Sequence, residues 1–118
     1  MSSPVLQALA GAPELAAKYT AFRDAAHAAL GEERVAQIRH AVAKVHKVDA
    51  PKPSGELPPA TLRYAQRMPF EHTAITDEEA AAVVAELGEQ DYVAFCVVAA
   101  LADAECRAEK TRLAELSS

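Results

Sequence analysis

Apolar residues recur every three or four positions through most of the chain, and this spacing predicts helices. The clearest stripe consists of Leu15, Tyr19, Phe22, Ala26 and Leu30, which share one face of a helix. Glycines and prolines interrupt the pattern and mark the predicted helix ends. We therefore expect five or six helices, over Val5–Leu9, Pro13–Leu30, Glu32–Val45, Pro59–Met68, Thr76–Leu87 and Glu89–Leu116.

The last predicted helix is apolar nearly all round between Val93 and Leu101. Such a helix is normally covered on every side, and a chain of this length has few helices to cover it. We expect this helix to be central to the fold and also to lie partly in a subunit interface. A homo-oligomer formed through the helix 89–116 follows from this expectation.

Two helix ends carry local signals of their own. Thr76 and Glu79 form a capping box, in which each side chain bonds the other residue's backbone amide. Glu32 and Glu33 suit the positive N-terminal end of the third helix, whose Val35, Ile38 and Val42 share a face.

Between the third and fourth helices the segment 46–59 holds four prolines and a glycine. This composition excludes a helix or a central strand, so we predict a connecting loop. Each half of the chain is too short to fold alone. The chain is therefore predicted to be one domain, 1–118, with this loop joining its halves.

Composition supports an all-α fold, a compact bundle of five to six helices. Of the 118 residues, 51% are hydrophobic but only 5% are aromatic. Alanine, the best helix former, is abundant. The net charge of −5 argues against nucleic acid as a partner, because phosphate binding needs a basic stripe. The longest apolar run, Val93 to Ala102, is too short to span a membrane, and no secretory signal is evident. We predict a cytoplasmic protein.

Cys96 and Cys106 lie about 15 Å apart along the predicted last helix, so they cannot pair with each other. Free cysteines are usually buried, and we interpret both as small core residues. The alternative for Cys106 is thiol chemistry, with Arg107 lowering its pKa.

Asp103 extends an apolar stripe and needs a polar partner. An ion pair with Arg107, four residues on, is the ordinary interpretation, and a carboxylate aimed into a pocket is the functional one. His40 lies opposite the apolar stripe and is expected in solvent, whereas His46 lies at the edge of that stripe, where a pocket lip would be. No metal-binding spacing, nucleophile motif or phosphate-binding loop is present, so no metal, cofactor or catalytic residue is predicted. The candidate pocket consists of Arg39, His46, Tyr64, His72, Asp103, Cys106 and Arg107.

Three segments carry a resemblance to a known family. Leu62–Met68, Glu71–Glu78 and Ala100–Arg107 resemble the second half of the carboxymuconolactone decarboxylase and alkylhydroperoxidase D superfamily. That family has a helical core and forms dimers, trimers and hexamers. The resemblance implies an alkylhydroperoxidase D-like helical core and an oligomer for this chain.

The chain departs from the family where the chemistry of the redox members lies. Those members carry a Cys-x-x-Cys motif and a histidine just after the helix that matches Val35–Val45. Here that stretch is the proline-bearing loop and holds no cysteine. The two family asparagines of the last helix are replaced by Asp103 and Cys106, although Arg107 matches.

Three hypotheses follow from the sequence. The first is a non-catalytic structural, binding or partner-subunit module. The second is an enzyme with a rebuilt pocket that acts on a small molecule. The third is thiol-based antioxidant activity through Cys106.

Overall fold

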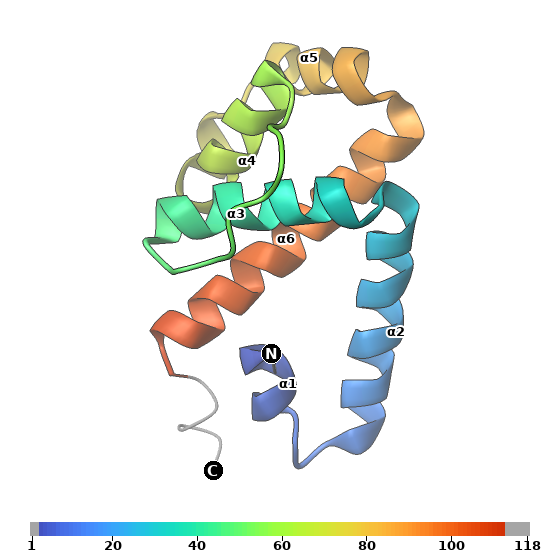
Figure 1. Ribbon diagram of the computed structural model, residues 1–118, viewed down its shortest axis with the longest axis vertical. Coiled ribbons are helices and arrows are strands. Elements are labelled where there is room, and N and C mark those ends of the chain that lie inside the picture. The colour runs from blue at the N-terminus through green and yellow to red at the C-terminus, as the bar shows by residue number, and fades with distance from the viewer. Residues whose placement is uncertain (1–2, 113–118) are drawn as a thin grey trace.

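The computed structural model describes residues 3–112 and contains six α-helices joined mostly by short turns (Figure 1). No strand occurs among these residues, so the predicted all-α fold is confirmed. Within the same part of the chain, no helix has an apolar stretch long enough to cross a membrane. The helices are α1 (Pro4–Ala8), α2 (Pro13–Leu30), α3 (Glu32–His46), α4 (Pro59–Glu71), α5 (Asp77–Leu87) and α6 (Glu89–Lys110), with a 3-10 turn at His72–Ala74.

The core lies where α3 crosses α6. Ile38 and Val42 of α3 are fully buried there, as are Phe95 and Val98 of α6. Helix α4 packs against α3, and α5 packs against α4 and α6, so these two helices close one end of the core (Figure 1). The apolar stripe predicted for the third helix is therefore the main contact surface of α3.

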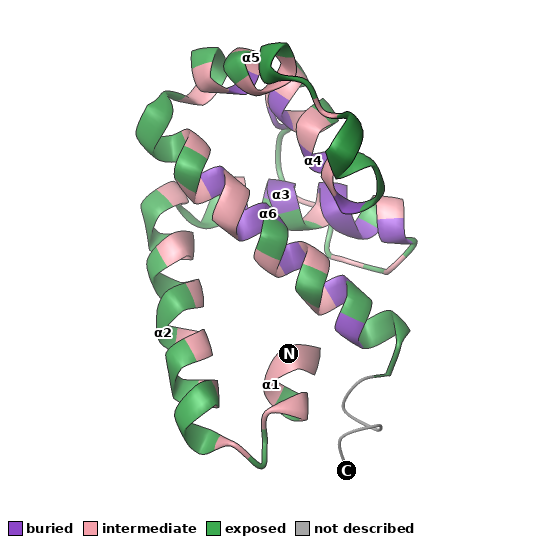
Figure 2. Ribbon diagram, turned by 180° about the vertical axis from the view of Figure 1, so that it is seen from behind, coloured by how far each residue is buried: buried purple, intermediate pink, exposed green. Residues whose placement is uncertain are grey.

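Helix α6 has one buried and one open face. Phe95, Ala99 and Ala102 point into the core, whereas the side chain of Val93 is 62% exposed. Figure 2 looks onto the open side, where α6 runs across the front with no other helix over it. Helix α6 is therefore central to the fold, as predicted, on its inner face, but its outer face is not covered by the described residues.

Helix α2 differs from the prediction. No residue of α2 is buried, and Leu15 and Phe22 are 57% and 56% exposed. Of its predicted stripe, Ala26 and Leu30 pack against the core. The rest of the helix runs away from the start of α3 toward α1 (Figure 1).

One carboxylate of α6 accepts hydrogen bonds from the N-terminal part of the chain. The hydroxyl groups of Ser3 and Tyr19 both donate to Oε1 of Glu105. This carboxylate therefore joins α1, α2 and α6 at a single oxygen atom.

Two corners of the fold have the same geometry. Gly31 joins α2 to α3 with φ 89° and ψ 156°, and Gly88 joins α5 to α6 with φ 88° and ψ 160°. Each glycine lies in the sequence Leu-Gly-Glu and ends one helix while beginning the next. Only glycine adopts this conformation readily, so both corners depend on one residue type.

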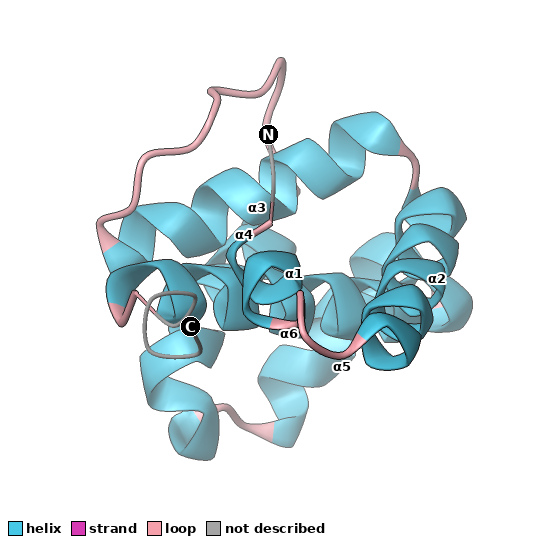
Figure 3. Ribbon diagram, turned by 90° about the horizontal axis from the view of Figure 1, so that it is seen from below, coloured by secondary structure: helices cyan, strands magenta, loops and turns pink. Residues whose placement is uncertain are grey.

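The proline-bearing connector, 47–58, is a loop, as its composition predicts, and it is partly packed against the rest of the chain. Figure 3 shows it as the longest loop, on the outer side of α3. Leu57 is buried, and the side-chain amide of Gln37 donates to the carbonyl of Ser54 at 3.1 Å. The C-terminal part of the connector is thus fixed by the burial of Leu57 in the core and by the hydrogen bond from Gln37 of α3 to Ser54.

Two predicted helix ends are wrong. Helix α4 continues through Pro69 to Glu71 instead of ending at Met68, although Pro69 has no backbone N–H to donate. Helix α6 ends at Lys110, where the Thr111 hydroxyl donates to the carbonyl of Arg107 at 2.8 Å. The remainder of the predicted helix, 113–116, lies outside the described residues.

Candidate functional site

Three of the seven predicted pocket residues come together where the C-terminal ends of α3, α4 and α6 meet. His46 contributes from α3, and Asp103 and Arg107 contribute from α6. Phe70 of α4 and Lys110 of α6 complete the group. We call these five residues the His46 cluster.

The His46 ring is completely buried, so the expectation of a pocket lip is wrong. Its Nε2 lies 2.6 Å from Oδ1 of Asp103, and its Nδ1 lies 3.3 Å from Nζ of Lys110. An ammonium group can only donate, so Nδ1 is the acceptor and the ring hydrogen is assigned to Nε2. Both ring nitrogens are therefore occupied by protein groups.

Asp103 forms the ion pair that the sequence predicts and also a contact that it does not predict. Arg107 Nε lies 3.0 and 3.1 Å from the two Asp103 oxygens, which confirms the predicted ion pair. The same carboxylate also turns inward and accepts from His46. Arg107 in turn donates from Nη2 to the carbonyl of Pro69, which ties α4 to this network.

Phe70 covers the cluster from the solvent side. Its ring centroid lies 4.7 Å from that of His46, and the Arg107 and Lys110 cations lie 5.1 and 5.2 Å from the ring centroid. The side chain is nevertheless 53% exposed. Sequence reasoning missed Phe70 because the predicted α4 ended before it.

A carboxylate hydrogen-bonded to an imidazole is a pairing that general bases use. A general base, however, needs its second nitrogen directed at a substrate proton. In the His46 cluster that nitrogen meets Lys110. As arranged, the cluster joins three helix ends and does not present a base to a ligand.

Cys106 is buried beside this network as a neutral thiol. Burial, together with the nearby carboxylates of Asp103 and Glu109 and against the opposing charge of Arg39, raises its pKa to about 11. The interpretation in which Arg107 lowers this pKa is therefore wrong. A thiolate is the reactive form, so the position disfavours thiol chemistry.

The remaining candidates lie apart from the cluster. Tyr64 contacts the rings of Tyr92 and Phe95, with its hydroxyl 3.2 Å from that of Tyr92. His72 is exposed in the 3-10 turn, and Arg39 is exposed on α3. The seven predicted residues therefore do not line one pocket.

Two groups that the sequence did not single out are left without partners. Nη1 of Arg34 and Nδ1 of His40 are buried and have no hydrogen-bond partner. His40 was expected in solvent but is half-buried, because the connector passes beside it. No signal in the sequence marks either atom, since the burial comes from a distant segment.

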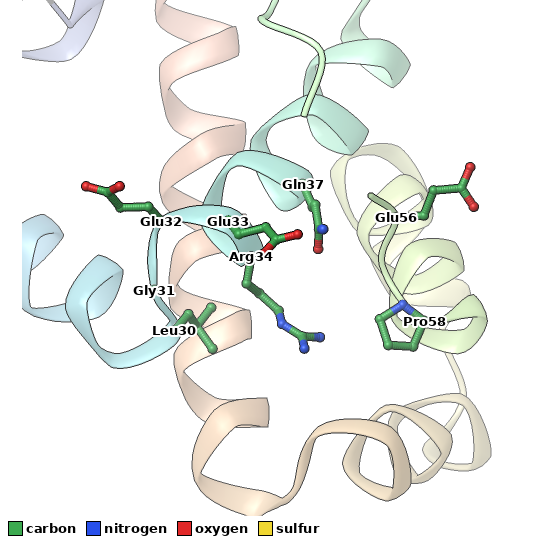
Figure 4. A pocket seen from close by; sticks show the side chains of 8 residues that line it. All are labelled: Leu30, Gly31, Glu32, Glu33, Arg34, Gln37, Glu56 and Pro58. Atoms are coloured by element: carbon green, nitrogen blue, oxygen red, sulfur yellow. The ribbon is translucent and has the colours of Figure 1, made fainter. Parts of the chain in front are cut away.

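Two open hollows lie along α3, and neither is lined by any of the seven predicted residues. The larger, of about 490 Å³, lies between the start of α3 and the end of the connector (Figure 4). We call it the connector pocket; Leu30, Glu33, Arg34, Gln37, Glu56 and Pro58 are among its walls. The smaller, of about 350 Å³, lies between His40, Lys44, Lys47 and the start of the connector.

Within residues 3–112, no three histidine, cysteine or acidic side chains are grouped so as to hold a metal ion. No family model matches the sequence, and no curated protein or solved structure matches it. The resemblance to the carboxymuconolactone decarboxylase and alkylhydroperoxidase D superfamily therefore stays a prediction from motifs.

Proposed function

We propose that this chain is a non-catalytic helical module, of the carboxymuconolactone decarboxylase-like type, that assembles with a second copy of itself. The observation that carries the proposal is the open face of α6. We call this the α6 outer face and define it as Val93, Val97, Ala100 and Ala104.

The α6 outer face is an apolar stripe that the rest of the chain does not cover. Its residues are spaced by four, three and four positions, so they follow one side of the helix. Val93, Ala100 and Ala104 are exposed, and Val97 is half-buried. No charged residue interrupts the stripe, and uncovered apolar stripes typically mark protein interfaces.

The stripe fits a second copy of itself. Its large residues, Val93 and Val97, lie in the N-terminal half, and its small residues, Ala100 and Ala104, lie in the C-terminal half. A two-fold axis between residues 98 and 99 would pair Val93 with Ala104 of the second copy and Val97 with its Ala100. Each large side chain then faces a small one, which lets two helices pack closely.

Charge supports the same antiparallel arrangement. The first turn of α6 holds Glu89 and Asp91, and its last turn holds Arg107 and Lys110. In an antiparallel pair the acidic end of each helix lies near the basic end of the other. Opposite charges at an interface rim favour the correct partner and orientation.

The non-catalytic part of the proposal is supported by the state of the candidate groups. Both nitrogens of His46 are occupied, and the thiol of Cys106 is neutral and buried. Tyr64 and His72 lie apart from them. An enzyme built from the predicted residues would have to bring these groups together, so the structural module is the better-supported hypothesis. A cytoplasmic location stays a prediction.

Light scattering coupled to size exclusion tests the assembly. We expect a dimer or larger assembly at micromolar concentration. Ala100→Glu places a charge at the centre of the α6 outer face and should shift the mass to that of one chain. Ala81→Glu, at an exposed position of α5, is the matched control and should leave the assembly intact. A single-chain mass for the unsubstituted protein would refute the proposal.

Disulfide cross-linking tests the orientation in a Cys96→Ala, Cys106→Ala background. In an antiparallel pair, two copies of residue 93 lie about 16 Å apart along the helix axis, too far for a disulfide. Val93→Cys alone should therefore stay uncross-linked, whereas a mixture of Val93→Cys and Ala104→Cys chains should cross-link. Efficient self-cross-linking of Val93→Cys would contradict the antiparallel arrangement.

A further inference from the structure

We infer that α2 forms a second contact between two copies of the chain: where the copies pair through α6, their α2 helices cross each other at Phe22. This inference rests on the proposed function and adds a surface to it. We call that surface the α2 outer stripe and define it as Leu15, Phe22, Ala25 and Ala29. All four residues are exposed, and the exposed fractions of Leu15 and Phe22 are nearly equal, at 57% and 56%.

The α2 outer stripe faces the same side of the molecule as the α6 outer face. Tyr19 points from α2 to Glu105 of α6. Burial and the charge of Arg39 lower the pKa of His27, so His27 lies on the side of α2 nearer α3. Successive residues of a helix are about 100° apart, which places Phe22 about 60° from Tyr19 and about 140° from His27. Phe22 therefore points away from α3, as the α6 outer face does.

Figure 2 shows this side of the molecule, and none of the described helices lies in front of α2 or α6 there. A second copy that packs on the α6 outer face therefore also comes to lie over α2. Both helices are open to the same partner.

A second contact is needed because the α6 outer face is small. A stable homodimer buries roughly 800 Å² of each partner. Two valines and two alanines along one helix supply only a fraction of that area. An aromatic side chain contributes about 150–250 Å² when it is buried, and aromatic residues are enriched at interfaces. Phe22 supplies the large side chain that the α6 outer face lacks.

The proposed two-fold axis sets the place where α2 meets its counterpart. The axis passes between residues 98 and 99 of α6, so Glu105 lies about 10 Å from it along the helix. From Tyr19, which reaches Glu105, α2 runs back toward the N-terminal half of α6 (Figure 1). The part of α2 level with the axis thus lies one to two turns beyond Tyr19, where Phe22 and Ala25 are. A crossing centred between these residues sets each Phe22 against Ala25 of the second copy, a large side chain against a small one.

Leu15 lies outside this crossing. Figure 2 shows α2 inclined to α6, with its N-terminal end farther from α6 than its C-terminal end. Because the two-fold axis reverses direction along α6, the two α2 helices diverge on either side of the crossing. Leu15 precedes Phe22 by seven residues, about 10 Å along the helix. The α2 outer stripe therefore holds one large side chain inside the contact and one outside it.

The crossing needs no charged partner. Arg23 and Asp24, which follow Phe22, pair with each other within α2, with Nη2 of Arg23 3.4 Å from Oδ1 of Asp24. Ala25 and Ala29 carry no charge. A second copy presents the same apolar surface, and the pairing of α6 brings that surface to the crossing.

Sedimentation equilibrium over a range of protein concentrations measures the dissociation constant of the assembly. Phe22→Glu places a charge in the crossing and should weaken the assembly at least about tenfold, because aromatic residues at the centre of an interface dominate binding. Leu15→Glu is the matched control, with the same substitution at nearly the same exposure, and should change the constant by less than about threefold. Circular dichroism should show that both variants are folded, since neither side chain is buried, and Ala25→Glu replaces Phe22→Glu if the latter is not.

Cross-linking with a short bis-maleimide in the Cys96→Ala, Cys106→Ala background locates the crossing. Two copies of residue 25 lie within one helical turn of the crossing, so Ala25→Cys should cross-link with itself. Two copies of residue 14 lie on the diverging ends of the helices, about 20 Å apart or more, so Glu14→Cys should not.

The outcomes separate this inference from the proposed assembly. An unchanged dissociation constant in Phe22→Glu, with Ala100→Glu still giving single chains, would overturn the crossing at Phe22 and leave the α6 pairing intact. The α2 outer stripe would then be open to a different protein. Equal weakening by Phe22→Glu and Leu15→Glu would also overturn it, because the whole of α2 would then take part. A single-chain mass for the unsubstituted protein would remove both proposals.

Discussion

Helices α2 and α3 meet at Gly31 and carry similar apolar stripes, yet their surroundings differ. Seven of the 15 residues of α3 are buried, and none of the 18 residues of α2 is. Helix α3 lies between α6 and α4, whereas α2 packs against α6 and, less extensively, against α3. An apolar stripe thus shows that one face of a helix is suited to burial, but it does not show whether other helices of the same chain pack against that face.

The largest test of this difference compares one aliphatic residue from each helix. Ile38→Ala removes a fully buried side chain of α3 and should lower the free energy of unfolding by about 2–5 kcal/mol. Leu15→Ala removes a mostly exposed side chain of α2 and should change it by less than about 0.5 kcal/mol. Urea unfolding measures both, and equal losses would mean that α2 is buried in solution.

A second prediction concerns the thiol on α6 beside the α3 crossing. The pKa of the Cys106 thiol is raised to about 11. In a Cys96→Ala variant at pH 8, we expect Cys106 of the folded protein to react with a disulfide reagent about a hundredfold more slowly than Cys106 of the protein unfolded in urea. The neutral thiol is the favoured form, so its contribution to stability is complete below about pH 9 and is lost as the pH rises through 11. Similar rates in the folded and unfolded states would show that the α3–α6 contact opens readily.

Asp103 tests the polar side of the same crossing. Asp103→Ala leaves the His46 Nε2 and the Arg107 guanidinium without their acceptor and should cost about 1–3 kcal/mol of unfolding free energy. Glu109→Ala, at an exposed position of the same helix, should change it by less than about 0.5 kcal/mol. A neutral result for Asp103→Ala would mean that the His46 cluster does not join the helix ends.

The smallest effect is expected for the hydrogen bond between Tyr19 of α2 and Glu105 of α6. Tyr19→Phe removes one hydrogen bond to Glu105 and should cost about 1 kcal/mol, or less, of unfolding free energy. Burial and the Glu105 carboxylate raise the pKa of Tyr19, so its contribution is present below about pH 10 and is lost as the pH rises above that. Between pH 9 and 11 the variant should therefore lose less stability than the unsubstituted chain, as followed by thermal unfolding. An identical alkaline profile would place Tyr19 away from Glu105.

Features coded by neighbouring residues were predictable from the sequence. The capping box at Thr76 is present, with Thr76 Oγ1 accepting from the Glu79 amide at 3.2 Å. The glycine stops at Gly31 and Gly88 and the core stripe of α3 were also predicted. Each depends on groups within one or two helical turns, which the chain places together whatever the remaining fold is.

Features that need a distant partner were not predictable. His46 meets Asp103, 57 positions away, and Phe22 is exposed because no distant segment packs over it. The burial of Nη1 of Arg34 is likewise a property of the folded chain. Of the candidate site, the sequence predicted the Asp103–Arg107 pair and the resemblance of Arg107 to a family residue, but not the surroundings of either.

The corner at Gly31 has a mechanical consequence. Helix α2 extends about 27 Å from it, so a swing of only 10° at this one residue would displace the far end by about 5 Å. Leu15 lies near that end of α2. The hydrogen bond from Tyr19 to the Glu105 carboxylate restrains the movement of this part of the helix. The Gly31 backbone and the Glu105 carboxylate therefore act at opposite ends of α2, and a change at either would alter the direction of the helix without changing a residue along its length.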